Sequence, residues 1–458
     1  MHSNKNRPIT ISYRSGWRDY QDKLKRTSAG RNRVRRSARI FSVLFILAAA
    51  GWAAVAGVNS LKTYFGTAET LRSADAALAP ADLLADRLDK SKLQSMLVSE
   101  QFLNLDKSSF YITRENRRLR VDTSLDTNLQ NYLHGKMNTA HAKYIAMVVL
   151  EPDTGKVISM VGFDKNDPGA NPCLSSQYPA ASVFKIVTAA AAIDVFHYSA
   201  DTVCTFNGKK HTLYKRQLGK KTNRYTNRIS LAQSFAQSVN PVFGKLGAHY
   251  LGRENLEKFS RAFGFNQRFN FEIPVEPSRI EITDEPYNWA ELACGFNRKT
   301  TLSPLHGALM AAAVVNDGQF VEPTIINRIT DEQGHIVYQG TQKKLGRVTS
   351  PEASKVLGRM MATTVRSGTC KKMFRGYRKD KVLSRLAIGG KSGSIDTRRH
   401  DARFDWFVGF AEEKNGSGKI ALAMLVAHEK YIGKRAAYYA RLAIKHYFSD
   451  YFVKIKEN

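Results

Sequence analysis

The sequence predicts an α+β fold in which an antiparallel sheet is flanked by helices. Two apolar runs, residues 144–150 and 156–162, are joined by the turn sequence Glu-Pro-Asp-Thr-Gly and therefore predict a β-hairpin. Apolar runs at 406–411 and 420–427 predict two further strands near the C-terminus. With 43% hydrophobic and 24% charged residues, most of this 458-residue chain should fold as a globular protein.

Helical patterns lie on both sides of these strands. Residues 181–196 are rich in alanine, contain no helix breaker and predict a buried helix. Other segments with helical patterns are residues 126–137, 229–251 (interrupted at Pro241), 304–315, 350–365 and 435–448. Short strands are expected from residue 119 and at 386–389. Residues 207–228 hold eight Lys or Arg among polar residues and predict an exposed hairpin or loop.

The first 58 residues predict a membrane anchor. Residues 1–39 contain twelve Lys or Arg against two Asp and few apolar residues, which is typical of a disordered basic tail. Residues 40–58 carry no charge and are long enough for a single transmembrane helix. Because the basic tail should stay in the cytoplasm, the rest of the chain is expected in the periplasm, outside the inner membrane. A cleaved signal peptide is the alternative, since Ala54-Val-Ala56 resembles a cleavage site, but the lengths of the basic and apolar regions favour a retained anchor.

The remaining sequence divides into a linker and a main domain. Residues 59–117 are predicted to form a juxtamembrane linker, and residues 118–458 the main domain. Within the linker, residues 81–103 have leucines at helical spacing and are expected to pack on the main domain or on a partner. The formal net charge of +30 suits an anionic polymer or a membrane face. Nucleic acid is disfavoured as a partner, because the sequence has neither zinc-finger spacing nor an aromatic-interleaved basic motif.

The four cysteines leave two possibilities open. They form no Cys-x-x-Cys pair, and no histidine spacing completes a metal site, so no metal is expected. Cys173 and Cys204 flank the helix predicted at 181–196 and would be free to form a disulfide in an extracytoplasmic domain. Four unpaired cysteines are the alternative, since sequence does not determine pairing.

Three short motifs with nucleophilic or polar side chains occur once each and in this order: Ser182-Val-Phe-Lys185, Ser238-Val-Asn240 and Lys391-Ser392-Gly393. Singly, each has an ordinary explanation as a surface pair, a helix cap or a turn at the end of a strand. Their order and context together indicate an acyl-serine enzyme.

The first motif supplies a nucleophile and a base. A serine hydroxyl is a weak nucleophile until a neighbouring group takes its proton. Ser182 and Lys185 are three residues apart on a predicted helix and therefore share one face. Lysine acts as a base only when its pKa falls, which burial among apolar residues would cause. Pro179-Ala-Ala fits a helix start, where backbone N–H groups would stabilise a developing oxyanion.

The other two motifs supply groups that suit a peptide substrate. Ser238 would relay a proton to a leaving amine, and Asn240 would hold a substrate amide. A strand edge at the third motif would pair with an extended peptide, while Lys391 and Ser392 bind a carboxylate. Gly393 would let the substrate backbone approach closely.

The motifs and their flanking segments resemble the transpeptidase domain of penicillin-binding proteins. The flanking matches include Leu302-Ser-Pro-Leu-His306 and Asp405-Trp-Phe-Val-Gly-Phe-Ala411, and the resemblance covers residues 118–455. It implies a β-lactamase-like fold with an all-helical subdomain and a membrane-anchored D,D-transpeptidase. The implied partners are peptidoglycan stem peptides ending in D-Ala-D-Ala, β-lactams as covalent inhibitors, and cell-wall synthesis proteins. No cofactor is implied.

The resemblance also implies a role for each motif residue. Ser182 would form the acyl-enzyme with Lys185 as general base, and Ser238 would bridge Lys185 and the leaving group. The substrate would be bound by Asn240, Lys391, Ser392 and Gly393, with the backbone N–H groups of Ser182 and Ser394 as the oxyanion hole. One departure is Ser392, where these transpeptidases more often have threonine.

Alternative functions share the same acylation residues. A D,D-carboxypeptidase or a β-lactamase-like hydrolase would pass the acyl group to water. A β-lactamase needs a base for that water, and Glu285-Pro-Tyr-Asn288 only loosely resembles the segment that supplies it. A β-lactam sensor would need a cytoplasmic output domain, which residues 1–39 do not suit. A non-enzymatic divisome scaffold would have little reason to keep all three motifs.

Overall fold

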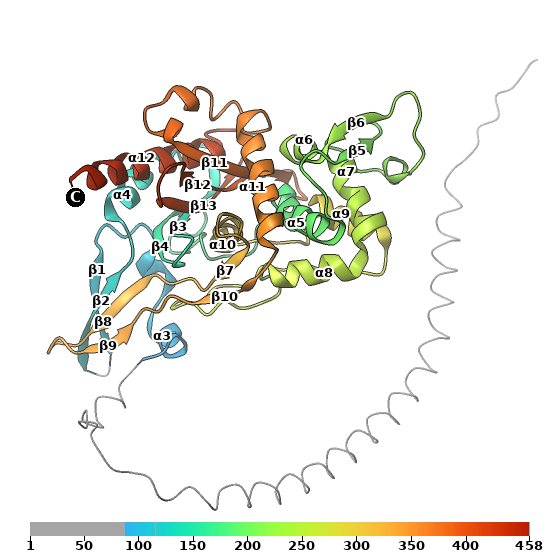
Figure 1. Cartoon of the computed structure of the whole chain (residues 1–458). Helices are drawn as coiled ribbons and strands as arrows, with labels where there is room; N and C mark the ends of the chain where they lie inside the picture. Colours follow the sequence, from blue (N-terminus) through green and yellow to red (C-terminus); the bar gives the residue numbers. More distant parts are fainter. Residues whose placement is uncertain (1–87, 115, 458) are drawn as a thin grey trace, which may run out of the picture. The chain divides into compact units, whose positions relative to one another are not determined.

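The computed structural model describes residues 88–114 and 116–457 (Figure 1). The predicted basic tail and the predicted transmembrane helix lie outside the described residues. Within the described ranges, no helix combines the length and the apolar character needed to cross a bilayer.

A five-stranded antiparallel sheet lies at the centre of the described part. Its strands, in spatial order, are β11 (Leu386–Asp396), β12 (Arg403–Glu413), β13 (Lys419–His428), β3 (Ala142–Leu150) and β4 (Val157–Asp164). Most residues of these strands are buried because both faces of the sheet are covered, which explains why the strands are continuous apolar runs. The predicted hairpin of residues 144–162 and the predicted C-terminal strands are confirmed.

Different helices cover the two faces of this sheet. On one face α4 (Thr127–Lys136) and α12 (Ala436–Glu457) pack against Met147 and Val149. On the other face α10 (Pro304–Val315) and α11 (Pro351–Arg366) pack in a core that includes Val148. Successive strand residues therefore contribute to opposite cores, as strand geometry requires. The prediction of an antiparallel sheet flanked by helices is confirmed.

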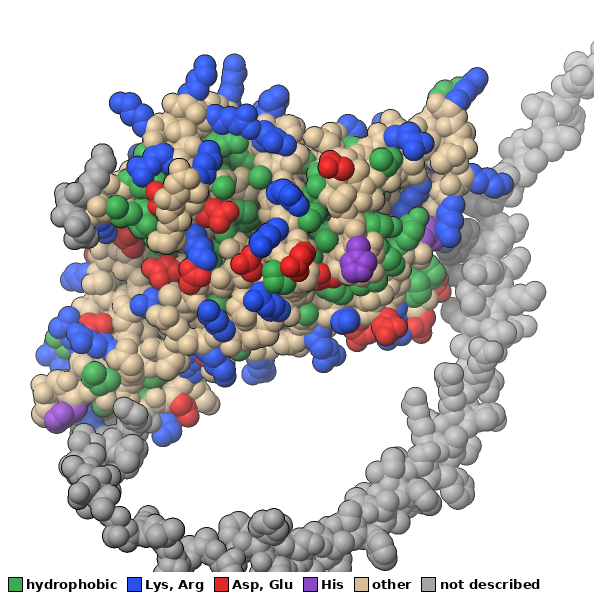
Figure 2. Space-filling view, viewed as in Figure 1, with side chains coloured by type: hydrophobic (Ala, Val, Ile, Leu, Met, Phe, Trp, Pro, Cys, Tyr) green, Lys and Arg blue, Asp and Glu red, His purple; other side chains and the backbone are tan. Residues whose placement is uncertain are grey.

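The helical subdomain begins at the first motif and lies beside the β11 end of the sheet (Figure 1). Its helices are η2 (Ala181–Phe184), α5 (Lys185–Phe196), α6 (Leu231–Ala236), α7 (Asn240–Lys245), η4 (Leu246–Leu251), α8 (Gly252–Ala262) and α9 (Pro286–Cys294). The subdomain is not all-helical, because β5 (Val203–Phe206) pairs with β6 (Asn227–Ser230). The connection between these strands contains η3 (Lys215–Leu218). All eight Lys and Arg side chains of residues 207–228 are exposed, as predicted, and Figure 2 shows Lys and Arg side chains on this projecting part of the molecule.

The helix predicted at 229–251 is interrupted earlier than expected. The break falls at residues 237–239, before Pro241, and Pro241 occupies the first turn of α7. Proline is well suited to that position because its missing N–H would have no partner within the helix. The break places the second motif in the turn between α6 and α7.

A second set of short elements lies at one end of the central sheet (Figure 1). It comprises the sheet β1 (Ser109–Arg114), β2 (Arg117–Thr123), β8 (Ile326–Thr330) and β9 (Ile336–Gln339), the pair β7 (Gln319–Val321) and β10 (Lys344–Arg347), and the helices α3 (Lys90–Met96) and η1 (Ser99–Phe102). Residues 88–114, which the sequence analysis assigned to a linker, therefore fold with residues 116–457. Two further short helices, η5 (Tyr377–Lys379) and η6 (Leu383–Arg385), precede β11.

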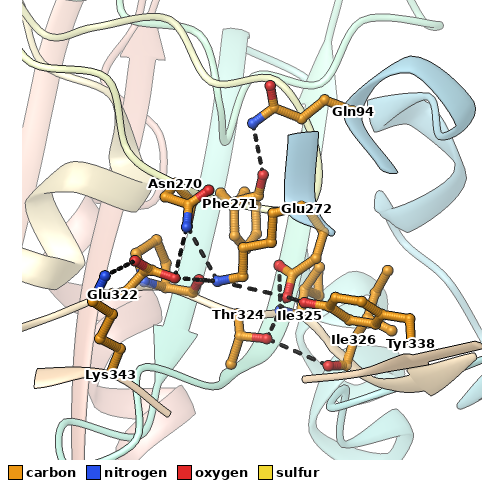
Figure 3. Close-up of polar contacts among 12 residues, drawn as sticks. Gln94, Asn270, Phe271, Glu272, Glu322, Thr324, Ile325, Ile326, Tyr338 and Lys343 are labelled. Atoms are coloured by element: carbon orange, nitrogen blue, oxygen red, sulfur yellow. Dashed lines mark hydrogen bonds and ion pairs between the residues drawn. The ribbon is translucent and has the colours of Figure 1, made fainter. Parts of the chain in front are cut away.

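A buried polar cluster fixes α3 in place. Lys90 Nζ donates to Glu322 Oε1 (2.9 Å) and to the backbone oxygen of Asn270 (3.1 Å). The neighbouring carboxylate of Glu272 is fully buried and accepts from Tyr338 Oη (2.8 Å; Figure 3). Buried charges are tolerated only when they are paired and hydrogen-bonded, so this cluster ties α3 to β9 and to the strand connections around it.

The cysteines are all thiols, so the disulfide considered between Cys173 and Cys204 is not formed. Cys173 is buried at the central sheet, where its thiol donates to the backbone oxygen of Val161 (3.4 Å). Cys204 lies in β5, in the helical subdomain. Burial raises the pKa of Cys173 to about 12 and of Cys204 to about 11, which disfavours the reactive thiolate.

Candidate active site

Ser182 and Lys185 are in direct contact at the start of α5. Lys185 is fully buried, and its Nζ donates to Ser182 Oγ (2.8 Å), Asn240 Oδ1 (2.8 Å) and the backbone oxygen of Cys294 (2.5 Å). These three acceptors use all three donors of an ammonium group. The first and second motifs therefore meet at Lys185.

Burial makes Lys185 a usable base. Desolvation lowers its pKa to about 8, although the nearby Cys294 thiol opposes the shift. At pH 7 about one tenth of such a lysine is neutral. A neutral amine keeps two donors, which Asn240 and the Cys294 carbonyl can occupy, and gains one lone pair. That lone pair then faces Ser182, whose hydroxyl can donate its proton to it.

The backbone beside the nucleophile is strained. Ala181 has a φ of 48°, a left-handed conformation that is rare for a residue with a Cβ. Gly295, which ends α9 with a φ of 67°, packs against it so closely that a Cβ would lie 1.9 Å from the Ala181 oxygen. Neither Gly295 nor the Cys294 carbonyl was predicted from the sequence, where the only signal is a glycine directly after a helical segment.

Ser238 is bound by the third motif rather than by the first. Lys391 is fully buried, and its Nζ donates to Ser238 Oγ (3.2 Å) and to the Ser392 carbonyl (2.7 Å). Burial, and secondly the charge of Lys185, lower the pKa of Lys391 well below its usual value. The expected bridge from Ser238 to Lys185 is not among these contacts, and Asn240 takes that place.

The third motif lies inside a strand, not at its end. The sequence analysis placed a strand at 386–389 followed by the motif, but β11 continues to Asp396 and pairs with β12 throughout, including Lys391 with Val408. Gly393 faces the first motif: a Cβ there would lie 3.2 Å from Val183. Pairing with a long apolar neighbour strand thus overrides the turn-like glycines of this segment.

The hydroxyl groups after Lys391 point to one cavity. Ser392 Oγ lies 2.5 Å from Thr369 Oγ1, and Ser394 Oγ accepts from Arg403 Nε (2.8 Å). The cavity measures about 580 Å³. It is lined by six of the eight predicted site residues, namely Ser182, Ser238, Asn240, Ser392, Gly393 and Ser394, while Lys185 and Lys391 are buried beside it. Its other walls include residues that the sequence analysis did not select: His211, Gly295, Arg298 and Thr369.

Comparison with known families agrees with this geometry. The family model described as penicillin binding protein transpeptidase domain matches residues 145–445, which is more than half of the chain. The chain belongs to the penicillin-binding protein transpeptidase family. This match includes all three motifs and the strands and helices that carry them.

Individual relatives are distant. Penicillin-binding protein PbpB of Mycolicibacterium smegmatis is 26% identical over 303 residues, which are 60% of this chain and 44% of that protein. Peptidoglycan D,D-transpeptidase PbpA of the same organism is 24% identical over 70% of this chain and 69% of its own length. The imipenem acyl-enzyme complex of penicillin-binding protein A from M. tuberculosis has the same fold, with a TM-score of 0.59 and 22% identity over 71% of this chain and 79% of that one. The chain thus spans less than half of the first relative.

Proposed function

We propose that the protein is a membrane-anchored peptidoglycan D,D-transpeptidase that works through an acyl-serine intermediate and is inhibited by β-lactams. The observation that carries this proposal is the contact between Lys185 Nζ and Ser182 Oγ, with the two carbonyl acceptors that fix the lysine. Membership of the penicillin-binding protein transpeptidase family supports the choice of substrate.

Acylation follows from the groups in contact. Ser182 Oγ attacks the carbonyl carbon of the penultimate D-alanine while its proton passes to Lys185 Nζ. The bond to the terminal D-alanine then breaks, and the leaving nitrogen needs a proton. Ser238 suits this step because its O–H proton is free to pass to the leaving amine, while Lys391 Nζ, which donates to the same oxygen, replaces that proton.

The terminal carboxylate of the donor peptide binds at β11. Lys391 supplies a buried amine whose charged form the bound carboxylate would favour, and the paired hydroxyls of Ser392 and Thr369 supply further donors at the cavity wall. The serine found in place of the more usual threonine keeps its hydroxyl. Because β11 is the edge strand of the sheet, an extended stem peptide can add to it as a further strand.

β-Lactam inhibition and membrane anchoring belong to the proposal. A β-lactam would acylate Ser182 as the peptide does, and the imipenem acyl-enzyme of the M. tuberculosis relative supports this. The charge-free run at residues 40–58 and the basic residues before it support an inner-membrane anchor with a periplasmic domain. Carbonate extraction of membranes tests the anchor: the full chain should stay in the pellet, and a variant lacking residues 1–59 should be released.

The contacts favour transfer to an amine over hydrolysis. A hydrolase of the class A β-lactamase type needs a free carboxylate near the acyl carbon to activate water. Glu285 instead occupies the N-cap position of α9, and no glutamate is among the described residues that line the cavity. Two aspartates do line it, and both are paired: Asp405 accepts from the backbone N–H of Ala436 (2.9 Å) and faces Arg435, and Asp396 lies 3.6 Å from Arg403 Nη1.

Incubation of the detergent-purified chain with a D-Ala-D-Ala stem peptide donor and an amine acceptor tests the function. Wild type should release D-alanine and form cross-linked peptide, and Ser182→Ala should do neither. Release of D-alanine without cross-linked product would instead identify a carboxypeptidase.

A further inference from the structure

His211 lines the same cavity as Ser182 and Ser238, although it comes from the exposed connection between β5 and β6. Its imidazole is hydrogen-bonded to the backbone of Ser238. None of the three motifs includes this residue, and the acylation chemistry derived above does not use it.

The chain around His211 is held firmly against the second motif. The carbonyl of Lys210 accepts from the backbone N–H of Asn240 (2.6 Å), and Lys210 Nζ donates to Gln237 Oε1 (2.6 Å). Two residues after His211, the carbonyl of Leu213 accepts from the hydroxyl of Tyr287 in α9 (2.8 Å). The backbone that carries His211 is therefore fixed beside the second motif by contacts on both sides of this residue.

The surroundings of His211 keep its ring neutral. Desolvation against the cavity wall lowers its pKa, and the ammonium groups of Lys185, Lys391 and Lys210 lower it further, while the bond to Ser238 opposes the shift. Lys185 approaches from α5, Lys391 from β11 and Lys210 from the same connection as His211. A neutral imidazole that donates one N–H to a carbonyl presents its second nitrogen as a hydrogen-bond acceptor.

This imidazole nitrogen lies in the cavity where the second half of the reaction, the transfer of the acyl group from Ser182 to an amine, needs a hydrogen-bond acceptor. In acylation the leaving nitrogen departs beside Ser238. By microscopic reversibility, the amine that later attacks the acyl-enzyme enters at the same place. Lys185 and Lys391 supply donors there, and their charges disfavour an incoming ammonium, so an uncharged amine needs an acceptor for its N–H.

We propose that His211 binds the acceptor amine and orients it toward the acyl carbon on Ser182; this inference rests on the proposed transpeptidase function. In the transfer the amine nitrogen bonds to the acyl carbon and the bond from that carbon to Ser182 Oγ breaks. The proton lost by the nitrogen passes through Ser238 to Lys391, and Lys185 returns to Ser182 Oγ the proton that it took in acylation. His211 accepts a hydrogen bond from the amine throughout and gains no net proton.

The test separates acylation from transfer. Wild type, His211→Ala and His211→Gln are supplied with a D-alanyl thioester donor and with D-alanine as the added amine, and the ratio of new amide to hydrolysed acid is measured. For His211→Ala this ratio should fall about tenfold, the effect of losing one hydrogen bond made in the transition state. His211→Gln, which retains an acceptor oxygen, should recover part of it.

Two further measurements exclude a merely structural role. The rate of Ser182 labelling by penicillin and the thermal unfolding midpoint should stay at wild-type values in both variants. His335→Gln, in the exposed turn between β8 and β9, serves as the control and should leave the amide-to-acid ratio unchanged.

The outcomes are distinct. If wild type forms no acyl-enzyme, the proposed function fails. If wild type acylates and transfers but His211→Ala keeps the wild-type ratio, only the role of His211 is overturned. Equal loss of acylation and transfer in His211→Ala would also overturn it, because the residue would then serve the donor or the fold.

Discussion

Lys391 Nζ lies 3.2 Å from Ser238 Oγ, although 153 residues separate the two in the chain. The contact joins the motif that we propose binds the donor carboxylate to the motif that we propose protonates the leaving amine. Both residues are buried and occupy neighbouring elements, β11 and the turn between α6 and α7. In the proposed mechanism, the ammonium group of Lys391 thus serves both ends of the scissile bond.

Removal of this ammonium should damage acylation more than folding. Lys391→Met keeps the volume of the side chain but loses two hydrogen bonds and the charge. Because hydrogen bonds to charged groups are worth about 1.5–3 kcal/mol each, kcat/KM for peptide acylation should fall about 10²-fold or more. Lys381→Met, at an exposed lysine near η6, is the control and should acylate normally. An unchanged kcat/KM in Lys391→Met would contradict the assignment.

The rate of acylation should rise with pH. Lys185 accepts the proton of Ser182 only when neutral, and its pKa is lowered to about 8. The neutral fraction increases as the pH passes through that value, so the rate of penicillin acylation should climb from pH 6 and level off above pH 9. Stopped-flow measurement of the penicillin acylation rate between pH 6 and pH 9 tests this predicted rise. A rate that falls over the same interval would show that charged Lys185 is the active form.

Gly295→Ala should disrupt the nucleophile turn. A Cβ at this position would meet the oxygen of Ala181, next to Ser182. Gly376 also has a left-handed conformation, with a φ of 78°, but it has open space around it. Gly376→Ala should therefore cost only the conformational penalty of about 1–2 kcal/mol in unfolding free energy. Gly295→Ala should lose more stability and also acylation, and equal behaviour of the two variants would refute the steric argument.

Lys90→Met should destabilise the domain without removing a catalytic group. The substitution leaves Glu272 buried without its ammonium partner and Glu322 with only the more distant Lys343 (3.9 Å), and breaking such a buried pair costs about 3–5 kcal/mol. Lys92→Met changes an exposed lysine on the same helix and should be nearly neutral. Urea unfolding monitored by tryptophan fluorescence measures the difference, and similar midpoints for the two variants would mean that the cluster does not hold α3.

The parts of the site that lie close together in the chain could be predicted from sequence. Ser182 and Lys185 meet because a spacing of three residues on a helix requires it. The hairpin of residues 144–162 and the helix after Ser303 follow from apolar periodicity and turn residues in the same way. The order of the three motifs along the chain, together with their flanking segments, indicated the family that the sequence resembles.

The contacts that sequence reasoning missed come from distant elements without a chemical signature. The Cys294 carbonyl is an ordinary backbone group, and only the packing of α9 against α5 brings it to Lys185. Asn240 was expected at the substrate but binds Lys185, because the break between α6 and α7 turns it inward. The length of β11 depended on its partner strand, which no local pattern encodes.

The central claim is that Ser182 is the acylated residue. The most direct measurement is mass spectrometry of the full chain treated with penicillin, followed by proteolysis and identification of the modified peptide. The account predicts one adduct, located at Ser182 and absent from Ser182→Ala. An adduct on another residue, or none on folded protein, would contradict it.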